Sequence, residues 1–217
     1  MTNFATARRH MVDGQVRTAD VTDLRIISAM QDVPREHFVP PASAGLAYLD
    51  LDLPIGDGAS RRMLKPMVFA KLIHAAELVS TDRVLDVGCA TGYGAAVLAR
   101  VASQVVALEQ DANLAQAARA ALAAQSNVSV VSGPLTGGWP QGAPYDVILL
   151  EGATEIVPQA FLSQLKDGGR LVCILGSGPG AKAMLYRRSG QELGGRPIFD
   201  AAGGLLPGFA RAPAFAF

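Results

Sequence analysis

A glycine turn between an apolar run and the start of a helix is the most informative feature of this chain. The segment 83–93 reads Arg-Val-Leu-Asp-Val-Gly-Cys-Ala-Thr-Gly-Tyr. Gly88 and Gly92 lack the Cβ atom that would keep a ligand away from the backbone. A helix that begins near Tyr93 would point unpaired N–H groups into the turn. This pattern of residue types predicts a binding site for a nucleotide-like cofactor.

The spacing within the turn narrows the choice of ligand. A dinucleotide fingerprint reads G-x-G-x-x-G, whereas this chain reads D-x-G-x-A-x-G from position 86, the form found in methyltransferases. The next apolar run, 104–108, leads into Glu109, whose carboxylate can accept hydrogen bonds from both ribose hydroxyls. Asp86 faces the same crevice and suits a cationic amino group. S-adenosylmethionine is therefore the predicted ligand, and a glycine turn that only packs is the disfavoured alternative.

The composition is that of one globular α/β domain. The chain has 217 residues, enough for one domain with a full core. Half of the residues are hydrophobic and 18% are charged, which excludes a disordered chain. Lys plus Arg and Asp plus Glu each number 19, so the formal net charge is zero and no basic field favours nucleic acid as a partner.

The N-terminal residues and the cysteines indicate in which compartment the protein is located. Residues 1–20 are polar and carry several basic side chains without a following apolar run, so we expect neither a secretory signal nor a membrane span. Cys89 and Cys173 fall in the glycine turn and in an expected core strand, which favours free thiols in a reducing compartment. We therefore predict a cytoplasmic protein without a membrane partner. We interpret Cys89 as a small residue beside the cofactor rather than as a reactive thiol.

Strand and helix patterns alternate from residue 83 onward, which indicates a parallel sheet with helices on both faces. The predicted fold class is α/β, a Rossmann-like fold with a mostly parallel seven-stranded sheet. The expected strands are 83–87, 104–108, 127–131, 145–150 and 170–175, the expected helices are 93–101, 113–124 and 159–165, and a weaker antiparallel edge pair is expected at 183–187 and 205–209.

Residues 1–80 have a different pattern and are expected to form an N-terminal cap packed on the same domain. Residues 81–217 are expected to form the cofactor-binding unit. A glycine-rich loop placed over the cofactor is a candidate substrate lid. The expected elements of the cap are a helix over 21–30 capped by Asp20 or Thr22, the glycine-rich loop at 56–60 and a second helix over 66–78.

Several strings, taken together, resemble the protein-L-isoaspartate O-methyltransferase family over nearly the whole chain. The most specific string is Val-Pro-Arg-Glu-His-Phe-Val-Pro at 33–40, whereas the glycine turn is shared by many methyltransferases. The resemblance implies the class I S-adenosylmethionine-dependent methyltransferase fold. The other matching strings lie at 11–12, 29–30, 47–50, 53–56, 84–88, 91–93, 95–99, 144–146, Ile156 with Pro158, and 164–172.

The resemblance implies a protein-repair activity. The family transfers a methyl group from S-adenosylmethionine, which becomes S-adenosylhomocysteine, to the side-chain carboxylate of an L-isoaspartyl residue in damaged protein. The ester then cyclises to a succinimide that can reopen as normal aspartate. A carboxylate is already ionised at pH 7 and the sulfonium is an activated donor, so alignment supplies most of the catalysis. We therefore expect no general base, no metal and no catalytic histidine.

Three segments depart from the family pattern. The family's Gly-Gln-Thr-Ile-Ser-Gln-Pro is replaced by a segment at 58–66 that is two residues longer, and Ser60 matches the family hydroxyl only when the first glycines are aligned. The family's Gly-Asp-Gly is Gly-Pro-Leu at 133–135, which lacks the acid that would accept from the adenine amino group. The family's Thr-Ala-Ala is Glu-Gly-Ala at 151–153, and Glu151 would suit a cation and repel a carboxylate.

Three cations in the loop, Arg61, Arg62 and Lys65, offset that repulsion because an isoaspartyl substrate presents an anion. They are interpreted either as substrate-binding groups or as a solvated basic loop, with a salt bridge to Glu151 as a further alternative.

The predicted function is methylation of isoaspartyl proteins or peptides by an S-adenosylmethionine-dependent O-methyltransferase. The alternatives are a family paralogue that methylates another acceptor, such as a small molecule, and a non-catalytic S-adenosylmethionine-binding protein. The glycine spacing disfavours a dehydrogenase, and the sequence does not determine the oligomeric state. The predicted site residues are Ser60 for catalysis, Arg61 and Arg62 for substrate binding, and Asp86, Gly88, Cys89, Ala90, Gly92, Glu109, Gln110, Gly133, Pro134, Leu135 and Glu151 for cofactor binding.

Overall fold

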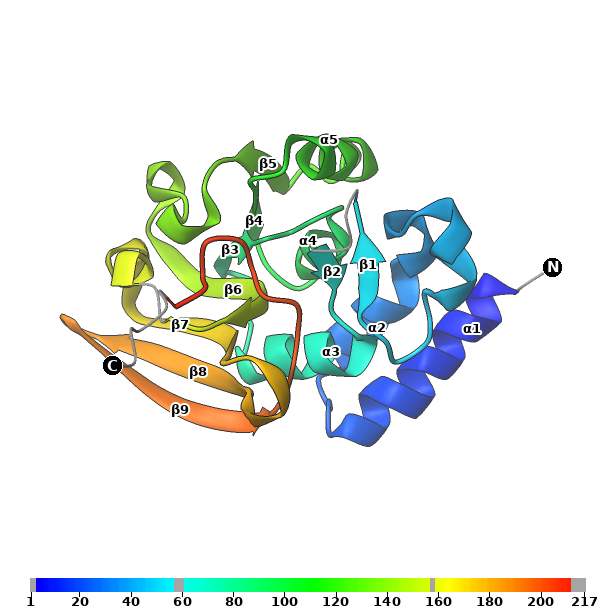
Figure 1. Cartoon of the computed structure of the whole chain (residues 1–217), viewed down its shortest axis with the longest axis horizontal. Helices are drawn as coiled ribbons and strands as arrows, with labels where there is room; N and C mark the ends of the chain where they lie inside the picture. The colour runs from blue at the N-terminus through cyan, green and yellow to red at the C-terminus, as the bar shows by residue number, and fades with distance from the viewer. Residues whose placement is uncertain (1–2, 57–60, 157–158, 212–217) are drawn as a thin grey trace, which may run out of the picture.

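One seven-stranded sheet runs through the centre of the protein (Figure 1). The structure is a computed structural model that describes residues 3–56, 61–156 and 159–211. The strand order is β5-β4-β3-β6-β7-β8-β9, in which β3 to β7 run parallel and β8 and β9 are antiparallel to their neighbours. This confirms the predicted fold class. The strands are β3 (Arg83–Val87), β4 (Gln104–Glu109), β5 (Val128–Ser132), β6 (Tyr145–Thr154), β7 (Leu165–Leu175), β8 (Lys182–Ser189) and β9 (Glu192–Asp200).

The direction of strand addition reverses at β3, which places the candidate site. The chain adds β4 on one side of β3 and β6 on the other. In open α/β sheets, ligands bind outside the carboxyl ends of the strands at such a reversal. The strands that meet there are covered on both faces, so Val84 on one face of β3 and Leu85 on the other are both fully buried.

The α-helices gather on one face of the sheet and short 3-10 helices cover the other. On the first face, one hydrophobic core joins the helices to strand residues such as Val84 and Val147. On the second face, Leu85 and Ile148 pack with the 3-10 helices and with Leu206 near the C-terminus. The α-helices are α1 (Phe4–Met11), α2 (Leu24–Asp32), α3 (Pro66–Ala75), α4 (Tyr93–Leu98) and α5 (Ala112–Ala121), and the 3-10 helices of the second face include η5 (Leu135–Gly137) and η7 (Gln159–Gln164). No helix among residues 3–56, 61–156 and 159–211 is long and apolar enough to cross a membrane.

The N-terminal cap adds a short hairpin to the molecule. Strands β1 (Leu53–Ile55) and β2 (Arg61–Met63) pair antiparallel, and their side chains alternate between buried and exposed. Helix α2 begins after Asp23, whose Oδ1 accepts from the Arg25 N–H at 2.9 Å, so the predicted caps Asp20 and Thr22 are wrong. Residues 57–60, which connect the two strands in the sequence, lie outside the described residues.

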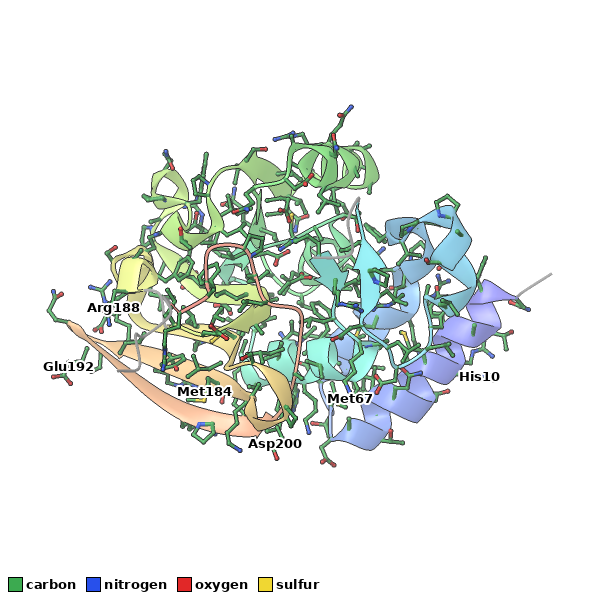
Figure 2. The ribbon with its side chains drawn as sticks, viewed as in Figure 1. His10, Met67, Met184, Arg188, Glu192 and Asp200 are labelled. Atoms are coloured by element: carbon green, nitrogen blue, oxygen red, sulfur yellow. The ribbon has the colours of Figure 1, made fainter. Side chains whose placement is uncertain are left out.

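Two predictions for the C-terminal third are wrong. Of the predicted helix 159–165, residues 159–164 form the 3-10 helix η7 instead of an α-helix, and Leu165 belongs to β7. The edge partner of β8 is β9, not 205–209. Strand β9 contains Gly194, Gly195 and Pro197, which conceal a strand pattern, and a proline is tolerated there because β9 is an edge strand. Figure 2 shows Arg188 and Glu192 at the hairpin end of this edge, far from the carboxyl end of β3.

The C-terminal segment 201–211 crosses the carboxyl ends of the central strands, where Figure 1 shows it in red in front of β6. The Ala153 N–H donates to the Gly204 carbonyl at 2.8 Å, and the Leu206 N–H donates to the Ala153 carbonyl at 2.9 Å. Leu205 forms only an isolated bridge with Ala153, and Leu206 and Phe209 are buried. This segment therefore forms a wall of the crevice instead of a strand.

Candidate functional site

The turn between β3 and α4 is held by hydrogen bonds to the neighbouring strand. The N–H groups of Gly88 and Cys89 donate to the Leu108 carbonyl at 2.9 and 3.2 Å. Gly88 has φ 78°, a left-handed conformation that favours glycine. A Cβ atom added to Gly88 would lie 2.9 Å from Leu206 Cδ2 and 3.4 Å from the guanidinium nitrogens of Arg61. The open side of Gly88 therefore faces the crevice at the carboxyl end of β3, where the side chains of Leu206 and Arg61 lie.

The space left by the missing side chain of Gly92 is filled by other side chains of the protein and is not open to a ligand. Gly92 has φ 95°, and a Cβ atom there would lie 2.7 Å from Leu122 Cδ1 and 3.4 Å from Ala118 Cβ. The missing side chain thus admits residues from α5 and the turn after it, so the expectation that Gly92 opens the backbone to a ligand is wrong. Ala90, the predicted residue between the glycines, also has a positive φ of 52° and helps the chain to turn back toward α4.

Glu109 ends β4, is fully buried and accepts four hydrogen bonds. Its Oε2 accepts from the Ala90 N–H at 2.8 Å and from Arg61 Nη2 at 2.6 Å. Its Oε1 accepts from the N–H groups of Gln110 and Asp111 at 2.9 and 3.1 Å. Because a carboxylate has about four lone-pair sites, these four donors occupy all the acceptor sites of Glu109. Ribose hydroxyls, the predicted partners of Glu109, must replace one of them.

Arg61 lies inside the crevice. Its side chain is 8% exposed, and Nη2 donates to the Gly88 carbonyl at 3.0 Å in addition to Glu109. The salt bridge that the sequence suggested between the loop and Glu151 is replaced by this pair with Glu109. Arg61 Nε is buried without a partner among the described residues. The guanidinium therefore joins Glu109 to the glycine turn.

The other cations of the hairpin lie outside the crevice. Side chains alternate along β2, so Arg62 is exposed on the face opposite to Arg61, and its Nη1 donates to the Asp52 carbonyl at 3.1 Å. Lys65 Nζ lies 3.9 Å from Asp50 Oδ2 in a half-exposed pair. The structure thus separates the two arginines that the sequence analysis grouped. Ser60, the predicted catalytic residue, lies outside the described residues.

Asp86 and Glu151 form a buried carboxyl pair at the carboxyl ends of β3 and β6. Neither oxygen of Asp86, nor Glu151 Oε1, has a hydrogen-bond partner among the described residues. Burial raises the pKa of Asp86 to about 7. Burial, reinforced by the charge of Asp86, raises the pKa of Glu151 well above its usual range. Because like charges so close disfavour double ionisation, one proton remains on the pair at neutral pH.

Glu151 folds over the first turn of α4. A Cβ atom added to Gly94 would lie 1.5 Å from Glu151 Oε1 and 2.5 Å from its carboxyl carbon. The absence of a side chain at Gly94 therefore makes the space for the Glu151 carboxyl group. The sequence showed that Glu151 departs from the family pattern, but it did not indicate that Gly94 is its neighbour. The two residues are far apart in the chain and meet only because the fold brings β6 and α4 together.

Cys89 behaves as a small buried residue of the turn. Burial raises the pKa of its thiol, and the charge of Asp86 raises it further. A thiol that keeps its proton is a weak nucleophile. Cys89 is therefore a buried, protonated thiol, and its place beside the cofactor stays a prediction.

The loops after β4 and β5 contain the remaining predicted cofactor residues. The Gly133 N–H donates to the Glu109 carbonyl at 3.2 Å, which brings these loops together. Gln110 and Pro134 are exposed, and Leu135 is buried at the start of η5. None of the side chains at 133–135 has an acceptor atom, so backbone carbonyls are the acceptors that this segment can offer to an adenine amino group.

Arg35, in the most specific of the quoted strings, has a structural role that the sequence analysis missed. It is fully buried, and it donates from Nε to the Ala47 carbonyl at 2.8 Å and from Nη2 to the Leu64 carbonyl at 2.7 Å. Its guanidinium carbon lies 4.6 Å from the centre of the Tyr93 ring. Arg35 therefore joins the cap to the first residue of α4. The family-like string at 33–40 drew attention to Arg35, but it did not indicate that the Arg35 side chain is buried.

A hollow of about 350 Å³ opens beside the glycine turn, between the cap and α5. Apolar side chains line it together with polar ones. It reaches Gly56 at the end of β1, so it lies next to the candidate substrate loop. The residues that line it are His37, Phe38, Val39, Pro40, Gly56, Thr91, Asp111, Asn113, Leu114, Ala117 and Ala121.

The arrangement suits a ligand that brings both hydroxyl groups and a positive charge. Glu109 can accept from hydroxyls once a donor leaves, and the singly charged pair of Asp86 and Glu151 attracts a cation. Apart from the proton shared with Glu151, the Asp86 oxygens have no hydrogen-bond partner among the described residues, so they can accept from such a cation. No group of three or more metal-ligating side chains occurs in the part of the chain that the structure describes.

Comparisons with known proteins agree on one family. A family model described as protein-L-isoaspartate(D-aspartate) O-methyltransferase matches residues 6–195. A protein-L-isoaspartate O-methyltransferase of Methylorubrum extorquens is 44% identical over 189 residues, which cover 87% of this chain and 82% of that protein. One of Methanoregula boonei is 40% identical over 187 residues, 85% of each chain.

Solved structures give the same picture. A protein-L-isoaspartate O-methyltransferase structure superimposes with a TM-score of 0.81 at 26% identity, covering 93% of this chain and 66% of that one. A Plasmodium falciparum protein of the same description, in complex with S-adenosyl-L-homocysteine, superimposes with a TM-score of 0.77 at 15% identity over 95% of this chain and 99% of that one. The second likeness bears on the fold alone.

Proposed function

The chain belongs to the protein-L-isoaspartate O-methyltransferase family of S-adenosylmethionine-dependent methyltransferases, and from this premise we propose that its acceptor is the side-chain carboxylate of L-isoaspartyl residues in damaged proteins or peptides. The observation that supports the acceptor is Arg61, a buried guanidinium within the crevice beside the glycine turn. Guanidinium groups match the geometry of carboxylates.

The proposed cofactor site is built from the carboxyl ends of β3 and β4. Glu109 would accept from the ribose hydroxyls, the backbone at Gly88 would lie against the cofactor, and Asp86 would accept from its ammonium group. The orphaned oxygens of Asp86 fit such a donor. Backbone carbonyls at 133–135 would read the adenine amino group. S-adenosylmethionine supplies an activated methyl group on a sulfonium sulfur.

The proposed catalysis depends on alignment. The acceptor carboxylate is ionised at pH 7, so no residue has to remove a proton from it. Arg61 would fix the carboxylate, and Ser60 would orient the attacking oxygen toward the methyl group. The hollow beside α5 would receive the chain that flanks the acceptor residue. The ester product can cyclise to a succinimide, which completes the proposed repair.

The proposal includes the division into a cap of residues 1–80 and a methyltransferase unit of residues 81–217. It also includes a cytoplasmic location, supported by the two cysteines. Both Cys89 and Cys173 are free and buried, as expected in a reducing compartment.

A second candidate is a paralogue that methylates another acceptor. Glu151 favours it, because a buried acid in the crevice disfavours an anionic acceptor unless the acid keeps its proton. The raised pKa of Glu151 meets that condition and leaves the isoaspartyl acceptor as the first choice.

The deciding experiment measures transfer of labelled methyl from S-adenosylmethionine to an isoaspartyl peptide and to its aspartyl twin. We expect transfer to the isoaspartyl peptide alone. Glu109→Gln should lower kcat/KM by about tenfold or more, the scale for losing hydrogen bonds to a charged group. Glu192→Gln, an exposed change at the distant hairpin, is the matched control. Cofactor binding without transfer to either peptide would reject the isoaspartyl acceptor in favour of the second candidate.

A further inference from the structure

Arg61 occupies a place that the cofactor needs. Its Nη2 holds one carboxylate oxygen of Glu109 at 2.6 Å and the Gly88 carbonyl at 3.0 Å. Glu109 is the acid proposed to accept from the ribose, and Gly88 is the position where a ligand would approach the backbone. One guanidinium therefore blocks both contacts.

Among the four donors to Glu109, Arg61 is the one that the cofactor would replace. The other three donors to Glu109 are backbone N–H groups of Ala90, Gln110 and Asp111, which the turn and the start of α5 fix in place. Arg61 is the only side chain among the described residues that donates to this carboxylate, so its departure breaks no backbone hydrogen bond of the turn. When hydroxyls bind to Glu109, Arg61 is therefore the donor that leaves.

Release of Arg61 from Glu109 would make its positive charge available to an anionic acceptor. While Arg61 is paired with Glu109, its charge is neutralised and largely buried, so it cannot attract a carboxylate. Once released, it is an unpaired cation beside the crevice. Strand β2 stays paired with β1, so the guanidinium remains within reach of the same site.

We propose that Arg61 closes the cofactor site of the empty enzyme and that S-adenosylmethionine displaces it from Glu109, so that an anionic acceptor gains its arginine only after the cofactor is in place. The second half of this inference rests on the proposed function, and the first half does not. Binding is then ordered, with the cofactor first. Arg61 acts as a positioning residue that couples the two ligands.

The first experiment measures cofactor affinity without any acceptor. S-adenosylhomocysteine carries the same ribose, and its affinity is measured by calorimetry for wild type, Arg61→Met and Arg61→Ala. Removing the competitor should tighten binding by about tenfold, the scale for hydrogen bonds to charged groups. Arg61→Met keeps the unbranched part of the side chain and much of its packing, which guards against a loss of folding in Arg61→Ala. Arg62→Ala removes the same charge from the opposite face of β2 and should change the affinity by less than about twofold.

The second experiment measures the affinity of an isoaspartyl peptide with and without saturating S-adenosylhomocysteine. Wild type should bind the peptide about tenfold more tightly with the cofactor product present, and by reciprocity the peptide should tighten the binding of S-adenosylhomocysteine by the same factor. Arg61→Met should lose this dependence.

The two experiments separate the inference from the proposed function. Unchanged or weaker S-adenosylhomocysteine binding by both Arg61 variants would overturn the displacement. Equal peptide affinity in the two conditions would overturn the order of binding. A wild type that binds S-adenosylhomocysteine but no isoaspartyl peptide would reject the proposed acceptor, and the cofactor experiment would still decide whether Arg61 is displaced.

Discussion

Gly94→Ala should destabilise the protein, although the same change stabilises most helices. Gly94 lies in α4, where alanine is favoured over glycine by about 1 kcal/mol or less. Here the added Cβ atom would lie 1.5 Å from Glu151 Oε1, a distance that no side chain tolerates. Glu151 must therefore move, and its new position breaks the buried pair with Asp86.

The magnitude follows from two opposing effects. Forcing an atom into a packed interior costs about 1–3 kcal/mol, and the displaced Glu151 carboxyl group loses its packing against the first turn of α4. These losses exceed the gain in helix propensity, so the free energy of unfolding should fall by about 1–3 kcal/mol. If Glu151 is first replaced by threonine, the obstacle disappears. Gly94→Ala should then be neutral or stabilising by up to about 1 kcal/mol.

Urea unfolding of the wild type, Gly94→Ala, Glu151→Thr and the double variant at pH 7 closes a double-mutant cycle. We expect an interaction free energy of about 2 kcal/mol, within the usual range for contacting residues. Gly14→Ala is the matched control, because Gly14 is in a helical segment and a Cβ atom there meets nothing within 4 Å. Stabilisation of the wild type by Gly94→Ala, equal to that by Gly14→Ala, would refute the reasoning.

Two further predictions concern buried charged groups. Burial raises the pKa of Asp86 from 3.8 to about 7, so between these values the folded protein binds more protons than the unfolded chain. The contribution of Asp86 to the free energy of unfolding should therefore fall by about 2–3 kcal/mol between pH 5 and pH 8. Burial raises the pKa of Glu151 as well, so this second acid adds to the fall. Asp86→Asn should make the fall smaller by about 2–3 kcal/mol in urea titrations, and an unchanged pH profile would contradict this. Arg35→Lys should lower the free energy of unfolding by about 2–3 kcal/mol, because lysine cannot reach the carbonyls of both Ala47 and Leu64. Exposed Arg62→Lys should stay within about 0.5 kcal/mol, and an equal loss in both variants would reject the role of the fork geometry.

The central strands and the glycine turn could be predicted because their signals are local. A buried parallel strand reads as an apolar run, and all such strands end at the same edge of the sheet. Placing Asp86, Glu109 and Glu151 at the ends of β3, β4 and β6 therefore required only the strand boundaries. Their convergence on one crevice is a property of the topology, and it follows from the alternation of strands and helices.

The details of the site depend on contacts between distant segments, which no local pattern contains. Arg61 and Arg62 are adjacent in the sequence, and β2 is too short to show which one points inward. Leu206 reaches the crevice because the C-terminal segment pairs with Ala153, and nothing near 206 indicates that partner. Edge strand β9 was missed for a related reason, since an edge strand needs neither an apolar run nor freedom from proline.

Charge balance explains how so acidic a crevice can exist without its ligand. Asp86, Glu109 and Glu151 lie close together and are almost fully buried, and three buried negative charges without compensation would cost many kcal/mol. The guanidinium of Arg61 compensates Glu109, while a retained proton leaves one charge on the other two acids. S-adenosylmethionine carries a sulfonium, an ammonium and one carboxylate, so its entry in place of Arg61 exchanges one net positive charge for another. Because the exchange conserves charge, Arg61 can stabilise the empty site and still yield to the cofactor through the better fit of ribose hydroxyls and ammonium group to the acids.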